Sequence, residues 1–197
     1  FNSTTSSNGY LFINSDATGG SDYDQTPTEV WATSYLIDAS NYSNIQLTFE
    51  HNYRWWKDTR AVRVSGDGGV NWTQYDITDF NGYPNNQNSN NPQLTSIDIS
   101  SVADNSDSLL IQFYYYDNDI WAWYWAVDDV RLSGTAEIFN EDFANGPYDW
   151  YDEYNFGNTN APWVYRGPNT IPNNSTGSQG AYAGSGVPIQ SPTTNNG

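Results

Sequence analysis

SLLIQFYYYDNDIWAWYWAVDDVRL, residues 108–132, carries eight aromatic residues and is the most strand-like part of the chain. Aromatic and β-branched side chains favour strands, so this stretch predicts two apolar strands joined as a hairpin at residues 117–119. It ends in the acidic pair Asp128 and Asp129. The rest of the chain holds no catalytic motif of comparable density, so the sequence is more informative about architecture than about a ligand.

The first of these strands is apolar or aromatic on both faces. Ile111, Phe113 and Tyr115 fall on one face, and Leu110, Gln112, Tyr114 and Tyr116 fall on the other. A strand of this kind is expected to be central in its sheet, because an edge strand with one solvated face would alternate with polar residues. We therefore expect one face to be covered by the core and the other to serve partly as a platform.

The composition of the whole chain favours an all-β protein rich in loops. Tyr, Trp, Thr, Ser, Asn and Gly are abundant among the 197 residues, and only 15% are charged. No cysteine is present, which excludes disulfides and thiolate metal sites. No apolar run approaches the length of a membrane span, and the absence of an initiator Met or signal peptide suggests a mature segment or an excised piece.

The charge balance argues against nucleic acid as a partner. Twenty-three acidic residues against six basic ones give a formal charge of −17, which repels phosphate backbones. The same acidity suits either divalent cations or a soluble extracellular surface. Asp16, Asp22 and Asp24 lie in one Gly- and Ser-rich loop, where they form either a calcium site or an ordinary solvated loop.

Residues 45–55 form a second strand with a clear alternation. Leu47, Phe49, His51 and Tyr53 are expected on one buried face, at a period of two. His51 is the only histidine, and without a second His or a Cys we expect a hydrogen-bonded residue at the edge of the core. A metal ligand or a catalytic base is the alternative.

Residues 66–69, Gly-Asp-Gly-Gly, predict a tight hairpin, because glycine supplies the positive φ that such turns need. Four of the six basic residues cluster around the preceding strand: Arg54, Lys57, Arg60 and Arg63. Pairing with nearby carboxylates is the expected role of this basic strip. The alternative is that it binds an acidic glycan or a neighbouring domain.

Several aromatic residues are candidates for carbohydrate binding by stacking. They are Trp55, Trp56, Trp121, Trp123 and Tyr124. Aromatic rings on a solvated face bind sugars well, whereas the same rings in a core only pack. The sequence leaves both roles open.

The chain contains signs of a tandem repeat. After residues 133–135, residues 137–143 begin a new strand, and residues 189–197 match residues 1–9 at four of nine positions, with an offset of 188. This offset is close to the length of one sandwich domain. We therefore expect residues 1–135 to be the latter part of one repeat and residues 136–197 the opening of the next, or a permuted or swapped completion of the same sandwich.

Three segments together carry a resemblance to a known family: residues 34–56 (SYLIDASNYSNIQLTFEHNYRWW), residues 62–72 (VRVSGDGGVNW) and residues 109–132 with its terminal WAVDDV. Their order resembles the MAM-like jelly-roll modules of secreted surface proteins of Bacteroidota, which include the cleaved-adhesin and choice-of-anchor modules. The segment FNEDFANG, residues 139–146, resembles the beginning of the same module. The resemblance implies a jelly-roll β-sandwich of two antiparallel sheets in a tandem-repeat surface protein.

The resemblance also implies a structural calcium ion, held between an acid of the first strand and an acid near the end of the last. The matching positions here are Asp128 or Asp129 in the last strand and Glu141 or Asp142 in the first. A pair of carboxylates in an apolar strand needs a cation or hydrogen-bond donors nearby, which agrees with this implication. Glu141 and Asp142 follow Asp129 in the chain, so they would complete the next copy or fold back onto this one.

The expected function is that of a noncatalytic repeat of a secreted or cell-surface bacterial protein, adhesive or structural, and stabilised by calcium. The resemblance implies export by the type IX system, with neighbouring repeats, glycans or other surface proteins as partners. A carbohydrate-binding module, free or appended to a secreted enzyme, is the alternative. Catalysis is not expected, because no Gly-x-Ser-x-Gly, HExxH or P-loop motif occurs and nothing singles out a carboxylate pair.

Overall fold

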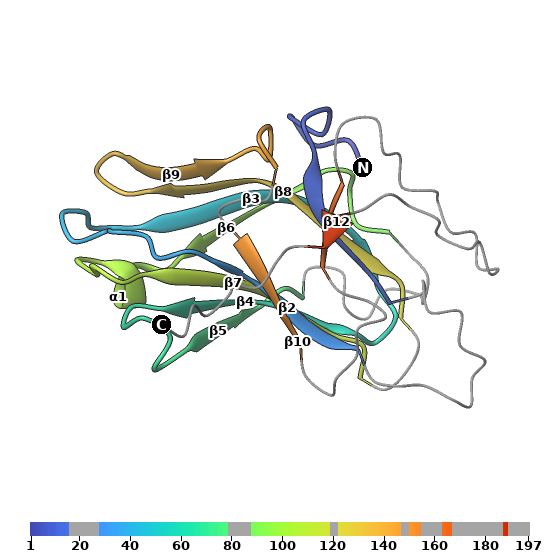
Figure 1. Cartoon of the computed structure of the whole chain (residues 1–197), viewed down its shortest axis with the longest axis horizontal. Coiled ribbons are helices and arrows are strands. Elements are labelled where there is room, and N and C mark those ends of the chain that lie inside the picture. Colours follow the sequence, from blue (N-terminus) through green and yellow to red (C-terminus); the bar gives the residue numbers. More distant parts are fainter. Residues whose placement is uncertain are drawn as a thin grey trace, which may run out of the picture.

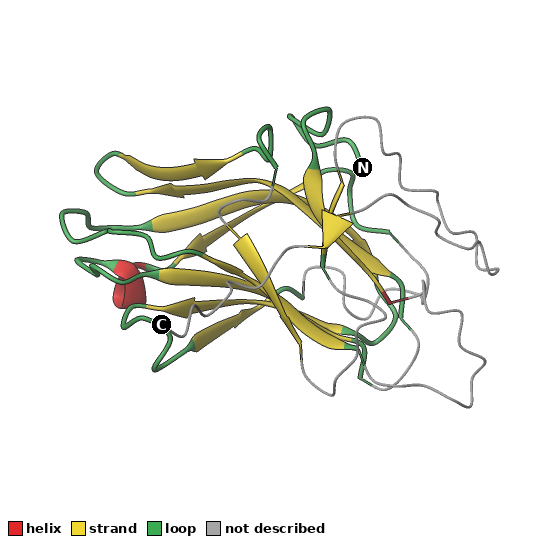
Figure 2. Cartoon of the chain, viewed as in Figure 1, coloured by secondary structure: helices red, strands yellow, loops and turns green. Residues whose placement is uncertain are grey.

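The computed structural model describes residues 1–15, 28–78, 88–118, 122–146, 150–154, 163–166 and 187–188. Two antiparallel β-sheets lie face to face (Figure 1). The first eight strands along the chain are β1 (Tyr10–Asn14), β2 (Glu29–Ser34), β3 (Gln46–Arg54), β4 (Thr59–Ser65), β5 (Thr73–Asp76), β6 (Gln93–Asp98), β7 (Leu110–Tyr116) and β8 (Tyr124–Ser133). The short helix α1 (Ser100–Ala103) is drawn in red in Figure 2, and no helix among the described residues is long and apolar enough to span a bilayer.

The order of these eight strands is that of a jelly roll. In the first sheet the neighbours are β1, β8, β3 and β6, and in the second sheet they are β2, β7, β4 and β5. Most connections therefore cross from one sheet to the other, which is the pattern of two interlocked Greek keys. The prediction of an all-β sandwich of two antiparallel sheets with jelly-roll order is confirmed.

Four further strands extend both sheets: β9 (Glu137–Glu141), β10 (Trp150–Tyr154), β11 (Val164–Arg166) and β12 (Val187–Pro188). β9 pairs with β8, β11 with β1 and β12 with β11 in the first sheet, while β10 pairs with β2 in the second. Strands of residues 136–197 are thus hydrogen-bonded to strands of residues 1–135 within one chain. That the two segments belong to successive copies of a repeat stays a prediction.

The core between the sheets follows the alternation seen in the sequence. Leu47, Phe49, His51 and Tyr53 are buried on the inner face of β3. Phe113 of β7 lies at the centre of an aromatic cluster, with ring centroids 5.1 Å from Phe49, 5.7 Å from Trp125 and 5.3 Å from Trp150. Burial of each such side chain contributes roughly 1.5–3 kcal/mol, so these rings join the two sheets strongly.

The hairpin predicted within residues 108–132 is wrong. β7 and β8 lie in different sheets: β7 pairs with β2 and β4, and β8 pairs with β1 and β3. The physical reason is that both strands are central in their sheets: β2 and β4 occupy the two edges of β7, and β1, β9 and β3 occupy those of β8, so no edge is left for a β7–β8 pair. The hairpin predicted at residues 66–69 does form, since β4 and β5 pair from Val64 opposite Thr73.

Candidate functional site

An acidic junction on β8 is the first candidate site, and it consists of Glu50, Asp128, Asp129 and Asp142. β1 pairs with β8 as far as Val127, and β9 begins its pairing at Val130. Since β3 pairs along the other edge of β8, β1 and β9 lie end to end along one edge. Asp128 and Asp129 fall in the gap between them, and Asp129 has a positive φ of 49° where the strand bulges.

The N-terminal segment of the chain fills the acidic junction with hydrogen-bond donors. Ser3 Oγ donates to Asp128 Oδ2 at 2.5 Å, and Thr5 donates through its amide and its hydroxyl to Asp129 at 3.1 and 2.9 Å. Thr4 donates in the same way to both oxygens of Glu50, at 2.6 and 2.7 Å. Because Glu50 of β3 lies opposite Asp128, the same loop satisfies carboxylates from two strands.

Burial dominates the electrostatics of this junction. It raises the pKa of the Asp128 carboxyl to about 8, and the charges of Asp129 and Glu50 act in the same direction. Burial also raises the pKa of Asp129, with additional repulsion from Glu50 and Asp142. Ionising both Asp128 and Asp129 is therefore costly unless hydrogen-bond donors or a cation offset the burial and the repulsion.

The acids at the end of β9 are held by neighbouring backbone amides. Glu141 Oε1 accepts a hydrogen bond from the Phe143 amide at 2.6 Å, and Asp142 Oδ1 accepts one from the Ala144 amide at 3.0 Å. Asn8 Nδ2 connects Asp142 to the N-terminal loop at 3.4 Å. In the part of the chain that the structure describes, no group of three or more His, Cys, Asp or Glu side chains is arranged to hold a metal ion. A calcium site at Asp128, Asp129, Glu141 and Asp142 stays a prediction, and Asp16, Asp22 and Asp24 lie outside the described residues.

The only histidine is buried in the core and fully hydrogen-bonded. Trp125 Nε1 donates to His51 Nδ1 at 3.1 Å, and His51 Nε2 lies 2.9 Å from Thr95 Oγ1. Since Nδ1 accepts a hydrogen bond, the proton of the neutral ring lies on Nε2. Burial, and then the charge of Arg60, lowers the pKa of His51 to about 3. The residue is therefore a neutral part of the core.

Four of the five aromatic residues predicted to stack sugars are described by the structure, and these four are partly buried and do not line the pocket described below. Trp55 and Trp56 pack against the core, and Tyr124 packs on the Phe12 ring with centroids 5.9 Å apart. Trp123 lies against the guanidinium of Arg54, 3.7 Å from its ring centroid. Trp121 lies outside the described residues.

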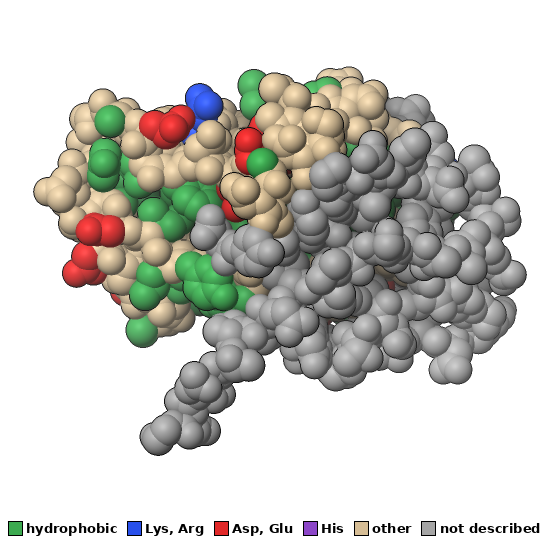
Figure 3. Space-filling model, turned by 45° about the horizontal axis from the view of Figure 1, so that its top comes forward, with side chains coloured by type: hydrophobic (Ala, Val, Ile, Leu, Met, Phe, Trp, Pro, Cys, Tyr) green, Lys and Arg blue, Asp and Glu red, His purple; other side chains and the backbone are tan. Residues whose placement is uncertain are grey.

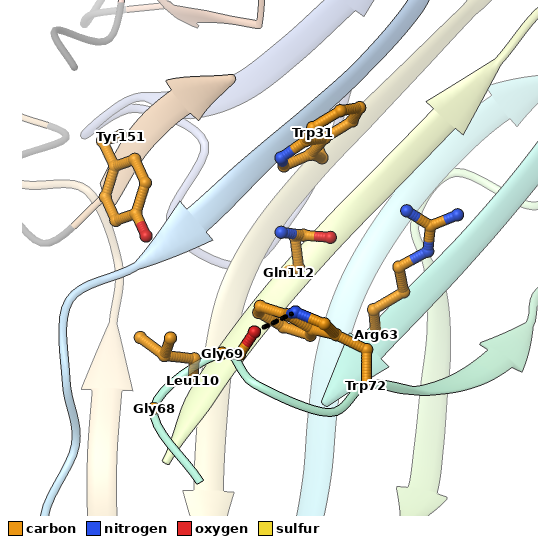
Figure 4. Close-up of a pocket in the computed structure, with 8 residues that line it drawn as sticks. All are labelled: Trp31, Arg63, Gly68, Gly69, Trp72, Leu110, Gln112 and Tyr151. Carbon is orange, nitrogen blue, oxygen red and sulfur yellow. Dashed lines mark hydrogen bonds between the residues drawn. The ribbon is translucent and has the colours of Figure 1, made fainter. Parts of the chain in front are cut away.

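A pocket of about 440 Å³ on the outer face of the second sheet is the second candidate site (Figure 4). The residues that line it are Trp31, Arg63, Gly68, Gly69, Trp72, Leu110, Gln112 and Tyr151. They come from β2, β4, β7, β10 and the turn between β4 and β5. We call this surface the pocket face. It lies on the face of β7 that carries Leu110, Gln112 and Tyr114, whereas Ile111, Phe113 and Tyr115 face the core. The sequence predicted one covered face and one platform on this strand without assigning them.

Strand register assembles the pocket face. One row crosses all five strands, because each of its members lies opposite the next: Tyr151, Thr33, Gln112, Arg63 and Gln74. The adjacent row contains Trp31 opposite Tyr114. Side chains at paired positions point to the same side of a sheet, so residues far apart in sequence meet on one surface.

Contacts within the rows fix these side chains. Gln112 Nε2 donates to Thr33 Oγ1 at 3.0 Å, and Tyr114 Oη donates to Glu29 Oε1 at 2.8 Å. The Tyr114 ring supports the guanidinium of Arg63, whose Cζ lies 3.5 Å from the ring centroid. Burial, with the hydrogen bond to Glu29, raises the pKa of Tyr114, so the phenol stays protonated as a donor.

The turn between β4 and β5 positions Trp72. Asp67 Oδ1 accepts hydrogen bonds from Ser65 Oγ at 2.7 Å and from the Asn71 amide at 2.9 Å, while Ser65 Oγ accepts one from the Gly69 amide. Trp72 Nε1 donates to the Gly69 carbonyl at 3.0 Å, which is the dashed line in Figure 4. The polar atom of the indole is thus satisfied within the turn, and the ring lines the pocket.

The chemistry available in the pocket is stacking and hydrogen bonding. Its lining residues offer indole and phenol rings, one amide and one guanidinium, and no Asp, Glu or His is among the described residues that line it. Sequence reasoning missed Trp31, Trp72, Gln112 and Tyr151 as site residues. Two of them had a signal in the sequence: Gln112 is the one residue of the strand predicted at residues 110–116 that is neither aromatic nor aliphatic, and Trp72 closely follows the glycine turn.

Comparison with known proteins leaves this site unassigned. No protein-family model matches the chain, and no curated protein matches it. A solved structure titled "PbXyn10C CBM APO" is similar to it, with 14% sequence identity, a TM-score of 0.35, and coverage of 80% of this chain and 87% of that one. A likeness at this level bears on neither the ligand nor the residues that bind it.

Proposed function

We propose that this chain is a noncatalytic module that binds a carbohydrate on its pocket face. The observation that carries the proposal is the pocket itself, which the rings of Trp31, Trp72 and Tyr151 line together with Gln112 and Arg63. The C–H faces of sugar rings pack on aromatic rings, and sugar hydroxyls hydrogen-bond to amide and guanidinium groups. A volume of about 440 Å³ lies within the range of small-molecule sites.

The absence of catalysis is part of this proposal. Glycoside hydrolysis needs two carboxylates about 5 to 10 Å apart across the scissile bond. The described lining of the pocket has none, and Glu29 is engaged with the Tyr114 hydroxyl at the edge of the face. The site is thus suited to retaining a glycan at the surface of a secreted or cell-attached protein.

The decisive experiment compares two groups of aromatic residues. Titration calorimetry of the full chain against a panel of soluble oligosaccharides identifies a bound member, and Trp31→Ala and Trp72→Ala are then measured against it. Loss of a central aromatic contact costs 2 kcal/mol or more at a binding site, so each variant should weaken binding at least about 30-fold.

Trp123→Ala is the matched control, because Trp123 is an equally large, partly exposed ring outside the pocket. It should bind the glycan as the unchanged chain does. The opposite pattern, with loss of binding only on Trp123→Ala, would transfer the site to the aromatic residues predicted from the sequence. Absence of binding to every oligosaccharide of a broad panel would contradict the proposal.

An adhesive or structural repeat stabilised by calcium is the second candidate function, and the acidic junction favours it. Its four carboxylates come from β3, β8 and the end of β9, which belong to both halves of the chain. A hard cation with oxygen ligands would offset their repulsion and join these strands. The two functions are compatible, because the junction and the pocket lie on different sheets.

A further inference from the structure

We propose that the glycan bound on the pocket face carries a carboxylate, as a uronic acid does, and that Arg63 binds this group. The inference rests on the proposed function and narrows it to acidic glycans. Its starting observation is that Arg63 is the one charged side chain among the described residues lining the pocket, in a protein with a formal charge of −17.

The guanidinium of Arg63 is held in a fixed position. Its Nε donates to Gln74 Oε1 at 2.9 Å, and its plane rests on the ring of Tyr114. Gln74 in turn donates through Nε2 to Asp76 Oδ1 at 2.7 Å, so an amide separates Arg63 from this carboxylate. The Tyr114 hydroxyl is also a hydrogen-bond partner of Arg63. Of the five N–H donors of a guanidinium, the one on Nε and one further donor are used by these contacts, and the remaining Nη–H groups can bind a ligand.

Arg63 differs from Arg60 and Arg131 in its charge balance. Arg60 forms an ion pair with Asp58 in the core, and Arg131 forms one with Glu137 at 3.2 Å. Among the described residues, no carboxylate lies within 4 Å of the Arg63 guanidinium nitrogens. The basic strip predicted from the sequence is thus divided between separate sites. Its one member in the pocket, Arg63, is linked to the carboxylate of Glu29 only through the Tyr114 hydroxyl.

A carboxylate is the anion that this geometry favours. The planar guanidinium donates two parallel hydrogen bonds to a carboxylate, and such charge-assisted pairs are about twice as strong as neutral ones. Acidic side chains are spread over the coloured part of the surface in Figure 3, so the general field of the protein repels anions. At ~0.15 M salt this field is screened beyond about 8 Å, and the local contact with Arg63 decides binding.

The test uses the full chain and matched pairs of glycans. Oligomers of galacturonate, glucuronate and mannuronate are each compared with their carboxyl-reduced counterparts, which keep the same linkages but lack the charge, and sulfated oligosaccharides form a further arm. We expect one or more of the uronate oligomers to bind at least about 10-fold more tightly than its reduced partner at ~0.15 M salt.

Three variants assign this difference to Arg63. Arg63→Gln should weaken binding of the acidic glycan about 10- to 100-fold and binding of its reduced partner by less than about 3-fold. Arg63→Lys keeps the charge but loses the planar guanidinium. Its affinity for the acidic glycan should lie between those of the unchanged chain and of Arg63→Gln. Arg131→Gln makes the same change of net charge on the other sheet and should leave both affinities unchanged.

The outcomes separate this inference from the proposed function. If reduced and acidic oligomers bind equally, or if only sulfated ones bind, the carboxylate inference is overturned while carbohydrate binding stands. If neutral glycans bind in a manner that depends on Trp31 and no uronate binds, the same conclusion holds. If nothing in any arm binds, both proposals fail.

Discussion

The acidic junction and the pocket face are both polar clusters on a β-sandwich, but the chain treats them in opposite ways. At the junction, Ser3, Thr4 and Thr5 donate hydrogen bonds to Asp128, Asp129 and Glu50. On the pocket face, Trp31, Trp72 and Gln112 line an open volume. The acidic pair that is conspicuous in the sequence thus receives its hydrogen bonds from the protein itself. The surface that is open to a ligand is formed by residues that are dispersed in the sequence.

The largest expected effect is the dependence of stability on pH at the acidic junction. It tests whether Asp128 is protonated in the folded protein. The pKa of Asp128 is raised from its ordinary value of 3.8 to about 8, so the folded state holds a proton there that the unfolded state releases. Its favourable contribution is therefore complete below pH 3.8 and is lost as the pH rises toward 8, with a limiting slope of about 1.4 kcal/mol per pH unit.

Asp128→Asn isolates this contribution, because Asn cannot ionise and still accepts a hydrogen bond from Ser3. In chelator, the variant should gain about 2 to 4 kcal/mol over the unchanged chain between pH 5 and pH 8, measured by urea unfolding at each pH. His51 acts in the other direction, since its lowered pKa costs stability as the pH falls from 6.5 toward 3, but it is common to both proteins. Parallel stability profiles would show that Asp128 is ionised in the native state.

The second prediction concerns calcium binding at the acidic junction. If calcium binds there, the junction is a ligand site like the pocket face, and the contrast between the two regions no longer holds. If calcium binds there, free calcium at one hundred times the Kd should stabilise the chain by about 2.7 kcal/mol, equivalent to a rise in Tm of about 5 to 10 °C. The measurement is a thermal melt in calcium and in excess chelator. The double variant Asp128→Asn, Asp129→Asn should lose the response, and an unchanged melt of the original chain in chelator would exclude a stabilising ion.

A smaller effect is expected at the pocket face, where the turn between β4 and β5 holds Trp72. Gly69 has a φ of +94°, and a Cβ there would lie 3.4 Å from Leu110 Cδ1 and 3.6 Å from the Trp72 ring. Gly69→Ala should cost about 1 to 2 kcal/mol of stability and also weaken glycan binding, since the turn that holds Trp72 is displaced. Chemical denaturation and calorimetry provide the two readouts.

Gly68→Ala is the control for backbone strain. Its φ is +70°, but the nearest atom to an added Cβ is Ser108 Cβ at 3.9 Å. We expect a similar loss of stability with binding retained. Equal losses of binding in both variants would mean that the turn acts as a whole and that the position of Trp72 is not the critical factor.

The alternation of apolar residues was sufficient to predict strands and their buried faces. Residues 45–55 and the glycine turn at 66–69 became β3 and the β4–β5 hairpin, because period-two burial and positive φ are local properties. The pairing of β7 and β8 was wrong, because the choice between a hairpin and a crossover depends on which strands cover each edge. That information is spread over the whole chain.

The candidate sites were predicted unevenly for the same reason. Asp128 and Asp129 were evident as adjacent acids in an apolar strand, but Glu50 reaches them only through the pairing of β3 with β8. The pocket face depends on register across five strands, in which Tyr151 and Gln74 are brought into one row with Gln112. A shift of a single residue in any pairing would turn these side chains to the opposite face.

The strands that follow β8 also have a consequence for how this protein behaves among other copies. β1 and β2 would each end a sheet of the eight-stranded jelly roll, and β11 and β10 cover those two edges with hydrogen-bonded backbone. Exposed strand edges act as templates for pairing between chains, which leads to aggregation or strand exchange. The residues after 135 thus move these two sheet ends outward from β1 and β2 to β12 and β10. A neighbouring molecule that supplied equivalent strands to β1 and β2 would be joined to the sandwich through its backbone.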